Sequence, residues 1–191
     1  MIQPKIKFLL MAALFAAPLA GAALLYFAFP ELIPGGRLNY GTLIEPARPL
    51  PAMHLLDVTG TVAPDSSLKG KWSLVYLGGV SCEEACRERL VLTRQVRLAL
   101  NEKRVRVRRV YLAPDVAAAA TAQAALATEH PDLKFFVDNG ARAEVFFKTG
   151  DPQSLFLLDP LANWLMVYSG PVEHKGLYKD LKKLLRFSQV G

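Results

Sequence analysis

The sequence predicts an α/β domain, in which helices flank a central mixed sheet, attached to an N-terminal transmembrane helix. Segments of strand and helix character alternate along most of the chain, an order typical of sheets whose central strands run mostly parallel. A hairpin pattern near the C-terminus adds antiparallel strands. The third observation is a long uncharged run at the start of the chain. A length of 191 residues fits one domain with such an appendage.

The uncharged run predicts a membrane anchor. It comprises residues 8–29, a stretch of 22 residues without a charge, which is enough to cross a hydrocarbon core of roughly 30 Å as a helix. Lys5 and Lys7 precede the run and Glu31 follows it, so the positive-inside tendency places residues 1–7 in the cytoplasm. We therefore expect a single-pass anchor in the inner (cytoplasmic) membrane, with the C-terminal domain in the periplasm.

A cleaved signal peptide is the alternative interpretation of this segment. Ala20-Gly21-Ala22 resembles a small-residue cleavage site that follows a basic start and a shorter apolar core. The apolar run continues well past Ala22, and this favours an uncleaved anchor. Pro18 can kink such a helix without preventing its insertion.

The next segment predicts a linker. Residues 30–51 are dense in proline and glycine, which suits an extended connection between a membrane and a domain. We expect one globular domain to occupy residues 52–191.

The first half of this domain predicts three strands and two helices. Residues 53–60 are typical of a short strand ending in a turn, and residues 73–77 of a fully buried strand. Residues 84–101 carry apolar side chains at helical spacing, whereas residues 104–112 alternate charged and apolar side chains and predict a strand. Residues 115–128 begin with an aspartate and are rich in alanine, so they predict a capped helix.

The alternating strand also predicts where its arginines lie. Arg104, Arg106 and Arg108 fall on one face of that strand. We interpret them as the solvated face of an edge strand, because charges at an edge discourage aggregation.

The second half of the domain predicts a strand, a short helix, a hairpin and a last helix. Residues 133–137 form the strand and residues 141–147 the short helix. Residues 154–158 and 164–168 flank an Asp-Pro turn and predict the hairpin. Residues 173–186 predict an amphipathic helix.

The charge distribution argues against nucleic-acid binding. The net charge of +6 is concentrated between Glu83 and Arg109, where nine basic residues face four acidic ones. That segment contains no aromatic side chain on which a base could stack. We therefore expect no nucleic-acid partner.

The chemistry of the chain is concentrated in its only two cysteines, Cys82 and Cys86. They follow a buried strand at the point where a helix begins. If that helix starts near Ser81 or Cys82, both cysteines lie on one helix face and their sulfurs can meet.

The helix N-terminus favours a thiolate at Cys82. Glu83 and Glu84 disfavour it, whereas Arg87 and Arg89 favour it, so the balance depends on the geometry. Outside the cytoplasm a cysteine pair normally meets oxidising conditions, so the disulfide form is one of the states to consider.

Three uses of this pair remain open. Two thiols separated by three residues suit reversible disulfide exchange, and two thiolates also suit Cu(I). A purely structural disulfide is the third, although so short a loop gains comparatively little stability from a cross-link. A structural zinc site normally needs four ligands, and the chain has no second cysteine pair.

Residues 69–86, KGKWSLVYLGGVSCEEAC, resemble the core motif of the Sco/SenC family of cytochrome c oxidase assembly proteins. Residues 56–60 resemble the opening strand and turn of that family, and residues 155–160 its late strand. The resemblance implies a membrane-anchored, thioredoxin-like domain that faces the periplasm. It also implies that Cys82 and Cys86 correspond to the metal and redox cysteines of the family.

The chain departs from the family pattern in ways that bear on copper. Proline usually follows each family cysteine, whereas Glu83 and Arg87 stand here. The third copper ligand in the family is a histidine about eight residues before the late-strand aspartate, here Asp159, and counting back reaches Asp151. A carboxylate is a poorer Cu(I) ligand than imidazole. The chain is therefore a divergent member that lacks the family histidine.

The three histidines and Pro152 are the other residues that bear on this site. His54, His130 and His174 stand away from the expected ligand position, and we interpret them as surface or capping residues. Pro152 is a candidate for the cis-proline that faces the cysteines in many thioredoxin-like oxidoreductases, although trans is the usual state of any proline.

These observations lead to three functional hypotheses. The first is a thiol-disulfide reductant in which Cys82 attacks and Cys86 resolves, with a cytochrome c oxidase subunit or its copper-delivery proteins as the partner. The second is a Cu(I) metallochaperone with a modified site formed by Cys82, Cys86 and Asp151. The third is a non-catalytic assembly scaffold whose cysteines are structural.

Overall fold

The chain consists of two compact units, Met1–Leu38 and Asn39–Gly191. The computed structural model describes residues 3–29, 39–64, 66–138, 140, 142–148 and 150–188. The first unit holds helix α1, Pro4–Ala28, whose side chains are exposed along its whole length. Among the described residues, α1 is the one helix long and apolar enough to cross a membrane. The predicted N-terminal helix is confirmed as a candidate membrane span that begins at Pro4 rather than at residue 8.

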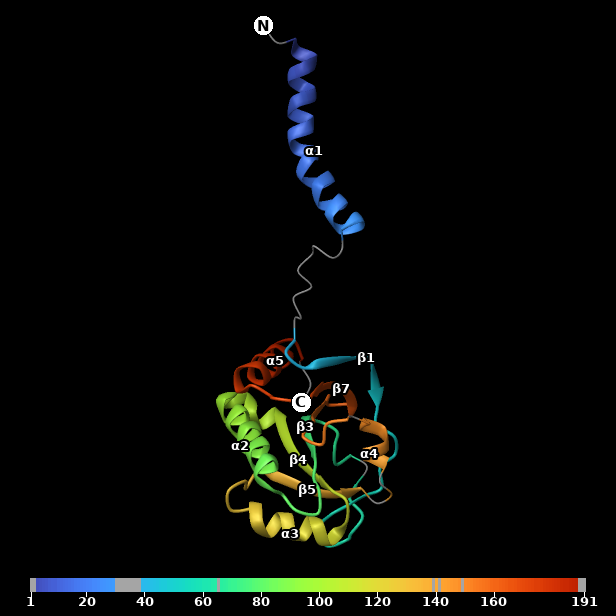
Figure 1. The fold of residues 1–191 in the computed structure, drawn as a ribbon, viewed down its shortest axis with the longest axis vertical. Coiled ribbons are helices and arrows are strands. Elements are labelled where there is room, and N and C mark those ends of the chain that lie inside the picture. Colours follow the sequence, from blue (N-terminus) through green and yellow to red (C-terminus); the bar gives the residue numbers. More distant parts are fainter. Residues whose placement is uncertain are drawn as a thin grey trace. The chain divides into compact units, whose positions relative to one another are not determined.

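The second unit is built on a mixed sheet (Figure 1). In the described part of the chain this sheet has seven strands in the order β1-β7-β6-β3-β4-β5-β2. The strands are β1 (Thr42–Pro49), β2 (Leu55–Leu56), β3 (Trp72–Leu77), β4 (Val107–Ala113), β5 (Leu133–Asp138), β6 (Leu155–Leu158) and β7 (Asn163–Tyr168). The central strands β3, β4 and β5 run parallel, and the remaining neighbours are antiparallel. The predicted mixed sheet is confirmed.

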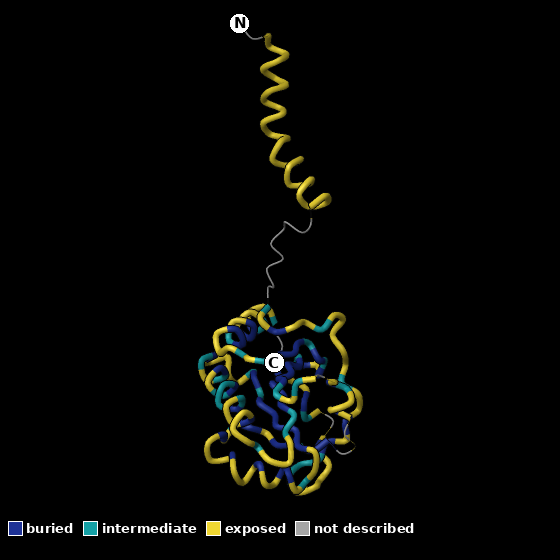
Figure 2. Tube along the Cα trace, in the orientation of Figure 1, coloured by how far each residue is buried: buried dark blue, intermediate teal, exposed yellow. Residues whose placement is uncertain are grey.

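Helices cover both faces of this sheet. They are α2 (Glu84–Ala99), η2 (Asn101–Arg106, a 3-10 helix), α3 (Val116–Leu126), α4 (Arg142–Phe147) and α5 (His174–Phe187). Buried side chains of α2, α3 and α5 share one core cluster, whereas those of α4 belong to a second cluster. Strand side chains alternate between the two clusters, as the period of two in a strand requires. Figure 2 shows that the central strands form the buried interior of this unit, whereas the edge strand β1 is largely exposed.

The predicted linker is shorter than expected at its C-terminal end. Residues 42–49 form strand β1, which pairs antiparallel with β7 at the edge of the sheet. The prolines of this segment predicted a linker because proline cannot donate to a sheet ladder. An edge strand tolerates such residues, and the register of β1 shifts between Leu43 and Arg48, around Pro46. Residues 30–38 of the predicted linker lie outside the described residues.

The prediction of an edge strand bearing three arginines is wrong. Arg104 and Arg106 belong to η2, and the strand that follows lies between β3 and β5 in the middle of the sheet. Arg106 and Arg108 donate hydrogen bonds to backbone carbonyls instead of facing solvent together. A sequence pattern of alternating charged and apolar residues fits two cases equally well. The charged side chains can face solvent, or they can hydrogen-bond to other parts of the domain.

The neighbouring Arg109 is fully buried, which the sequence pattern did not predict. Its side chain is 1% exposed and lies on the sheet face that α2 covers. Its guanidinium donates to Asp132 at 3.0 Å, to the hydroxyl of Thr93 at 3.0 Å and to the carbonyl of Leu90 at 2.7 Å. Burial lowers the pKa of Arg109 to about 10, which leaves it charged at neutral pH. These partners supply the counter-charge and the hydrogen-bond acceptors that a buried cation needs.

Candidate redox site

The two cysteines lie where the central strand β3 leads into α2. β3 is buried along nearly its whole length, and it ends at Leu77. Residues 78–83 then connect it to α2, whose N-cap is Glu83. Crevices outside the carboxyl ends of parallel strands are the usual binding sites of α/β sheets. Residues 78–83, the cysteine loop, therefore lie at the edge of the sheet where a ligand or partner can reach them.

Cys82 and Cys86 form a disulfide bond. The helix begins at Glu84 rather than at Ser81 or Cys82, so Cys82 precedes α2 and Cys86 lies in its first turn. Their Cα atoms are 5.2 Å apart, within the range normal for disulfides. Cys86 is 5% exposed, whereas Cys82 is half-buried and packs against the core cluster from its rim. An incoming sulfur can therefore reach Cys82 more readily than Cys86.

A close approach between Gly78 and Tyr111 fixes the start of the cysteine loop. The backbone amide of Gly78 donates to the carbonyl of Leu112 at 2.8 Å, which continues the β3–β4 ladder by one residue. A Cβ atom at Gly78 would overlap the Tyr111 ring, so only glycine fits here. The Tyr111 hydroxyl donates to the carbonyl of Gly79 at 3.4 Å. The strand face thus holds the loop that carries Cys82.

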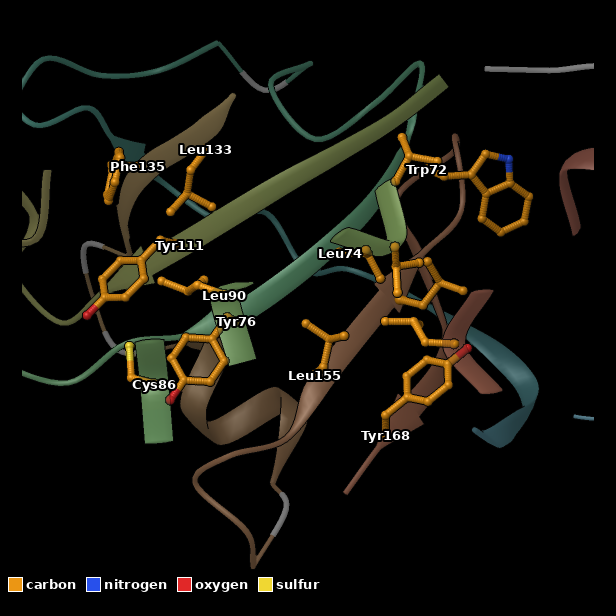
Figure 3. Packing of buried hydrophobic residues seen from close by; sticks show 14 of the residues in the cluster. Trp72, Leu74, Tyr76, Cys86, Leu90, Tyr111, Leu133, Phe135, Leu155 and Tyr168 are labelled. Atoms are coloured by element: carbon orange, nitrogen blue, oxygen red, sulfur yellow. The ribbon is translucent and has the colours of Figure 1, made fainter. Parts of the chain in front are cut away.

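Two tyrosines belong to the same buried cluster as Cys86 (Figure 3). The ring centroids of Tyr76 and Tyr111 are 6.0 Å apart, and the Tyr76 hydroxyl donates to Gln153 at 3.1 Å. Burial raises the pKa of Tyr111 to about 12 and also raises the pKa of Tyr76. Both phenols are therefore neutral at physiological pH and act as hydrogen-bond donors beside the pair.

A pocket of about 740 Å³ opens beside the disulfide. It is lined by the cysteine loop, by the start of α2, by the carboxyl ends of β4 and β5, by α4 and by residues 150–153. Of the two cysteines, Cys86 belongs to this lining and Cys82 does not. Its charged lining residues are Glu83, Glu84, Asp138, Glu144, Lys148 and Asp151. The volume is typical of sites that hold small molecules or parts of a peptide.

Asp151 lines this pocket, but its carboxylate is used by the neighbouring backbone. It accepts from the amide of Gly170 at 2.6 Å and from the amide of Gln153 at 2.8 Å. The hydrogen bond from Gly170 is the largest cause that lowers the pKa of Asp151, and Arg89 contributes as well. Asp151 therefore connects the loop before β6 to the loop after β7.

The side chains around the pocket lack the histidine that the family-type copper site adds to its two cysteines. None of the three histidines lines the pocket. His54 and His174 are exposed, and His130 is buried with Nδ1 3.4 Å from the guanidinium of Arg109. Within the described residues, no three His, Cys, Asp or Glu side chains are grouped to hold a metal ion. The side chains as they stand do not form the family-type copper site.

Pro152 lines the pocket in the trans form. Among the described residues, the one cis peptide bond is Glu45–Pro46, far from the cysteines in the sequence. The candidate cis-proline at position 152 is therefore not present in this structure, in keeping with the general preference for trans.

Sequence reasoning missed several residues of this site. Asp138 ends β5 and Glu144 lies in α4, and both reach the pocket only because those elements meet the cysteine loop in space. Gln153 is positioned by Asp151 and holds Tyr76. The Gly78-Gly79 pair directly after a buried strand was the one signal that could have indicated a close backbone approach.

The fold and the site define a thioredoxin-like protein with a cysteine pair at a strand-to-helix turn. A family model described as transmembrane-like, thioredoxin-like, C-terminal domain matches residues 72–188. The match spans more than half of the chain, so the chain belongs to this family. No match was found among curated proteins compared by sequence.

Solved structures of Sco proteins share the fold. Copper-bound ScoI of Arabidopsis thaliana is 18% identical, with a TM-score of 0.57 over 71% of this chain and 97% of that chain. Copper-bound ScoI of Bradyrhizobium japonicum is 22% identical, with a TM-score of 0.55 over 72% and 99%. Apo Sco1 of Thermus thermophilus is 17% identical, with a TM-score of 0.63 over 76% and 96%. These likenesses confirm the thioredoxin-like, Sco-type fold that the motif predicted.

Proposed function

We propose that this chain is a membrane-anchored thiol-disulfide reductant that acts in respiratory oxidase assembly. The observation that carries the proposal is the Cys82–Cys86 disulfide, with one half-buried and one buried sulfur, beside an open pocket. The Sco-type fold and the apolar helix α1 support a role close to a membrane. We further propose that α1 spans the inner membrane once and that the thioredoxin-like domain faces the periplasm.

The proposed reaction moves two electrons from the reduced pair to a partner disulfide. The Cys82 thiolate attacks one partner sulfur, a mixed disulfide forms, and the first partner thiolate leaves. The Cys86 thiolate then attacks the Cys82 sulfur and releases the second partner thiolate, which restores the Cys82–Cys86 disulfide. Another dithiol protein must reduce the pair again after each cycle. The partner would be the copper-site cysteines of a cytochrome c oxidase subunit or of a copper-delivery protein.

Site-directed variants test this role. In cells without the wild-type chain, Cys86→Ser should accumulate a mixed disulfide with its partner, because Cys82 can attack but nothing resolves the product. Cys82→Ser should trap nothing, and the double variant should leave the oxidase copper site incompletely assembled. Normal oxidase assembly with the double variant would overturn the proposal and favour the scaffold, in which the cysteines are only structural.

A Cu(I) metallochaperone is the second candidate. The observation that favours it is the occurrence of the same fold in ScoI proteins solved with copper bound. In the reduced chain, Cys82 and Cys86 would supply two soft ligands. Asp151 would supply a third only after leaving the amides of Gly170 and Gln153. Titration of the reduced chain with Cu(I) separates the candidates. Stoichiometric binding that weakens in Asp151→Asn would support the copper site, and no binding at stoichiometric Cu(I) would exclude it.

A further inference from the structure

The pocket beside the disulfide is acidic, although the chain as a whole carries a net charge of +6. Its charged lining residues, identified above, are five carboxylates and one lysine. Two of the carboxylates, Glu83 and Glu84, lie between the cysteines themselves. Their negative charges therefore lie on the short segment that joins Cys82 to Cys86.

The exposed carboxylates keep their charge available to a ligand. The side chains of Glu83, Glu84 and Glu144 are exposed, and they make no hydrogen bond or ion pair with another described residue. These three carboxylates can therefore attract a cationic ligand that enters the pocket.

Asp138 independently indicates that a ligand in the pocket carries a hydrogen-bond donor. Its side chain is 5% exposed and lines the pocket. One carboxylate oxygen accepts from the amide of Ala143, but Oδ1 is buried and has no hydrogen-bond partner within the described structure. Four buried side-chain atoms of the described residues lack such a partner, and Asp138 is the one of these four residues that lines the pocket. Buried polar atoms are nearly always hydrogen-bonded. An orphaned carboxylate oxygen at the pocket wall is suited to a donor carried by the ligand.

Nearby cations do not cancel this charge. Arg87 donates to the carbonyl of Cys82 at 3.2 Å, and Arg89 donates to the carbonyl of Gly170 at 2.8 Å. Lys148 is the one cation among the described lining residues. With both arginines included, carboxylates still outnumber cations by five to three.

We propose that the pocket selects cationic thiols and disulfides, so that the natural partner presents its reactive cysteine beside lysine or arginine. This inference rests on the proposed redox function and specifies its substrate class. The same carboxylates repel anionic thiols. The selectivity is electrostatic, so it acts through the rate of encounter and falls as salt screens the charges.

Three small thiols test the proposal on the full-length oxidised chain in a non-ionic detergent. Cysteamine is cationic, 2-mercaptoethanol neutral and 3-mercaptopropionate anionic. Each thiolate attacks the Cys82 sulfur and expels the Cys86 thiolate. A second thiolate then forms the small-molecule disulfide and leaves the pair reduced. The second-order rate of loss of the Cys82–Cys86 bond is the readout.

The ratio of the cysteamine rate to the 3-mercaptopropionate rate is compared between variants, because intrinsic thiol reactivity then cancels. The pocket variant combines Glu83→Gln, Glu84→Gln and Glu144→Gln. The control variant combines Glu88→Gln, Glu102→Gln and Glu129→Gln, which change the net charge equally but lie outside the pocket lining.

At low salt we expect the ratio to fall about fivefold in the pocket variant and to stay near the wild-type value in the control. Salt at about 0.5 M should reduce the wild-type ratio toward that of the pocket variant. Equal ratios in all three proteins, with ready reduction by 2-mercaptoethanol, would overturn the selectivity but leave the redox function in place. Failure of all three thiols to reduce the folded chain would overturn the redox function itself.

Discussion

The two ends of helix α2 use charged residues in opposite ways. Near the last turns, Arg97 and the buried Arg109 share the carboxylate of Asp132. Arg97 also donates to a backbone carbonyl, and Arg109 to a backbone carbonyl and a hydroxyl. At the first turn, Glu83 and Glu84 are exposed beside the disulfide and make no side-chain hydrogen bond. At the end with the last turns, both arginines are paired with a carboxylate inside the fold. The other end leaves its charges for a partner.

We therefore expect substitutions near the last turns of α2 to lower the stability of the domain. Substitutions at the pocket should mainly change the reactivity of the disulfide. Both tryptophans, Trp72 and Trp164, lie in the buried core of the thioredoxin-like domain. Their fluorescence therefore reports the unfolding of that domain in urea, and the free energies below refer to this measurement.

The largest effect is expected from Arg109→Met. The substitution removes donors from Asp132, Thr93 and the Leu90 carbonyl in a buried site, so it should cost about 3 kcal/mol of the free energy of unfolding. Arg104→Met is the matched control, because Arg104 is exposed, and it should change stability by less than about 0.5 kcal/mol. Equal values for the two variants would contradict the assignment of Arg109 as a buried structural cation.

Gly78→Ala should have the next largest effect. The added methyl group overlaps the Tyr111 ring, and overpacking of this kind costs about 2 kcal/mol. It should also slow reduction of the disulfide, because Tyr111 holds the loop that carries Cys82. Gly79→Ala serves as the control, since its Cβ would lie an ordinary 3.6 Å from the Ser81 carbonyl oxygen. The idea fails if both variants lose the same stability.

Arg97→Met should cost about 1 kcal/mol, because its ion pair with Asp132 is partly solvated and Arg109 still compensates that carboxylate. Arg97 also donates to the Val107 carbonyl at 2.7 Å, and this hydrogen bond is lost too. Part of the cost should disappear in high salt, which screens the ion pair. Lys103→Met provides an exposed control in the same region. If Arg97→Met lost as much free energy of unfolding as Arg109→Met, burial would not explain a difference between the two arginines.

Asp151→Asn should give the smallest loss, and its pH dependence is the diagnostic readout. Hydrogen bonding from Gly170 lowers the pKa of Asp151 below its ordinary value of 3.8, so the carboxylate contributes stability above that value. The difference from wild type should be constant near neutral pH and should shrink as the pH falls below 3.8, through the lowered pKa. A difference that stays constant through this acid range would exclude a charge-dependent contribution from Asp151.

Much of the fold could be predicted from local patterns. The buried strand β3, the capped helix α3 and the β6–β7 hairpin lie within a few residues of their predicted positions, because hydrophobic period and turn residues act over short distances. Asp115 accepts a hydrogen bond from the amide of Ala118, as an N-cap should. Strand β1 could not be predicted, since its prolines are acceptable only at an edge, and edge position is a tertiary property.

Some residues of the candidate site could likewise be predicted from the sequence, whereas others could not. Two cysteines at a strand-to-helix turn, the glutamates between them and the apolar N-terminal run follow from residue order, because their chemistry depends on spacing along one short segment. The sequence by itself thus determined the elements, the reactive pair and its family resemblance. Asp138, Glu144 and the partners of Arg109 come from distant segments, so only the packing of α2 and α4 against the sheet decided which charges are satisfied inside the fold and which line the pocket.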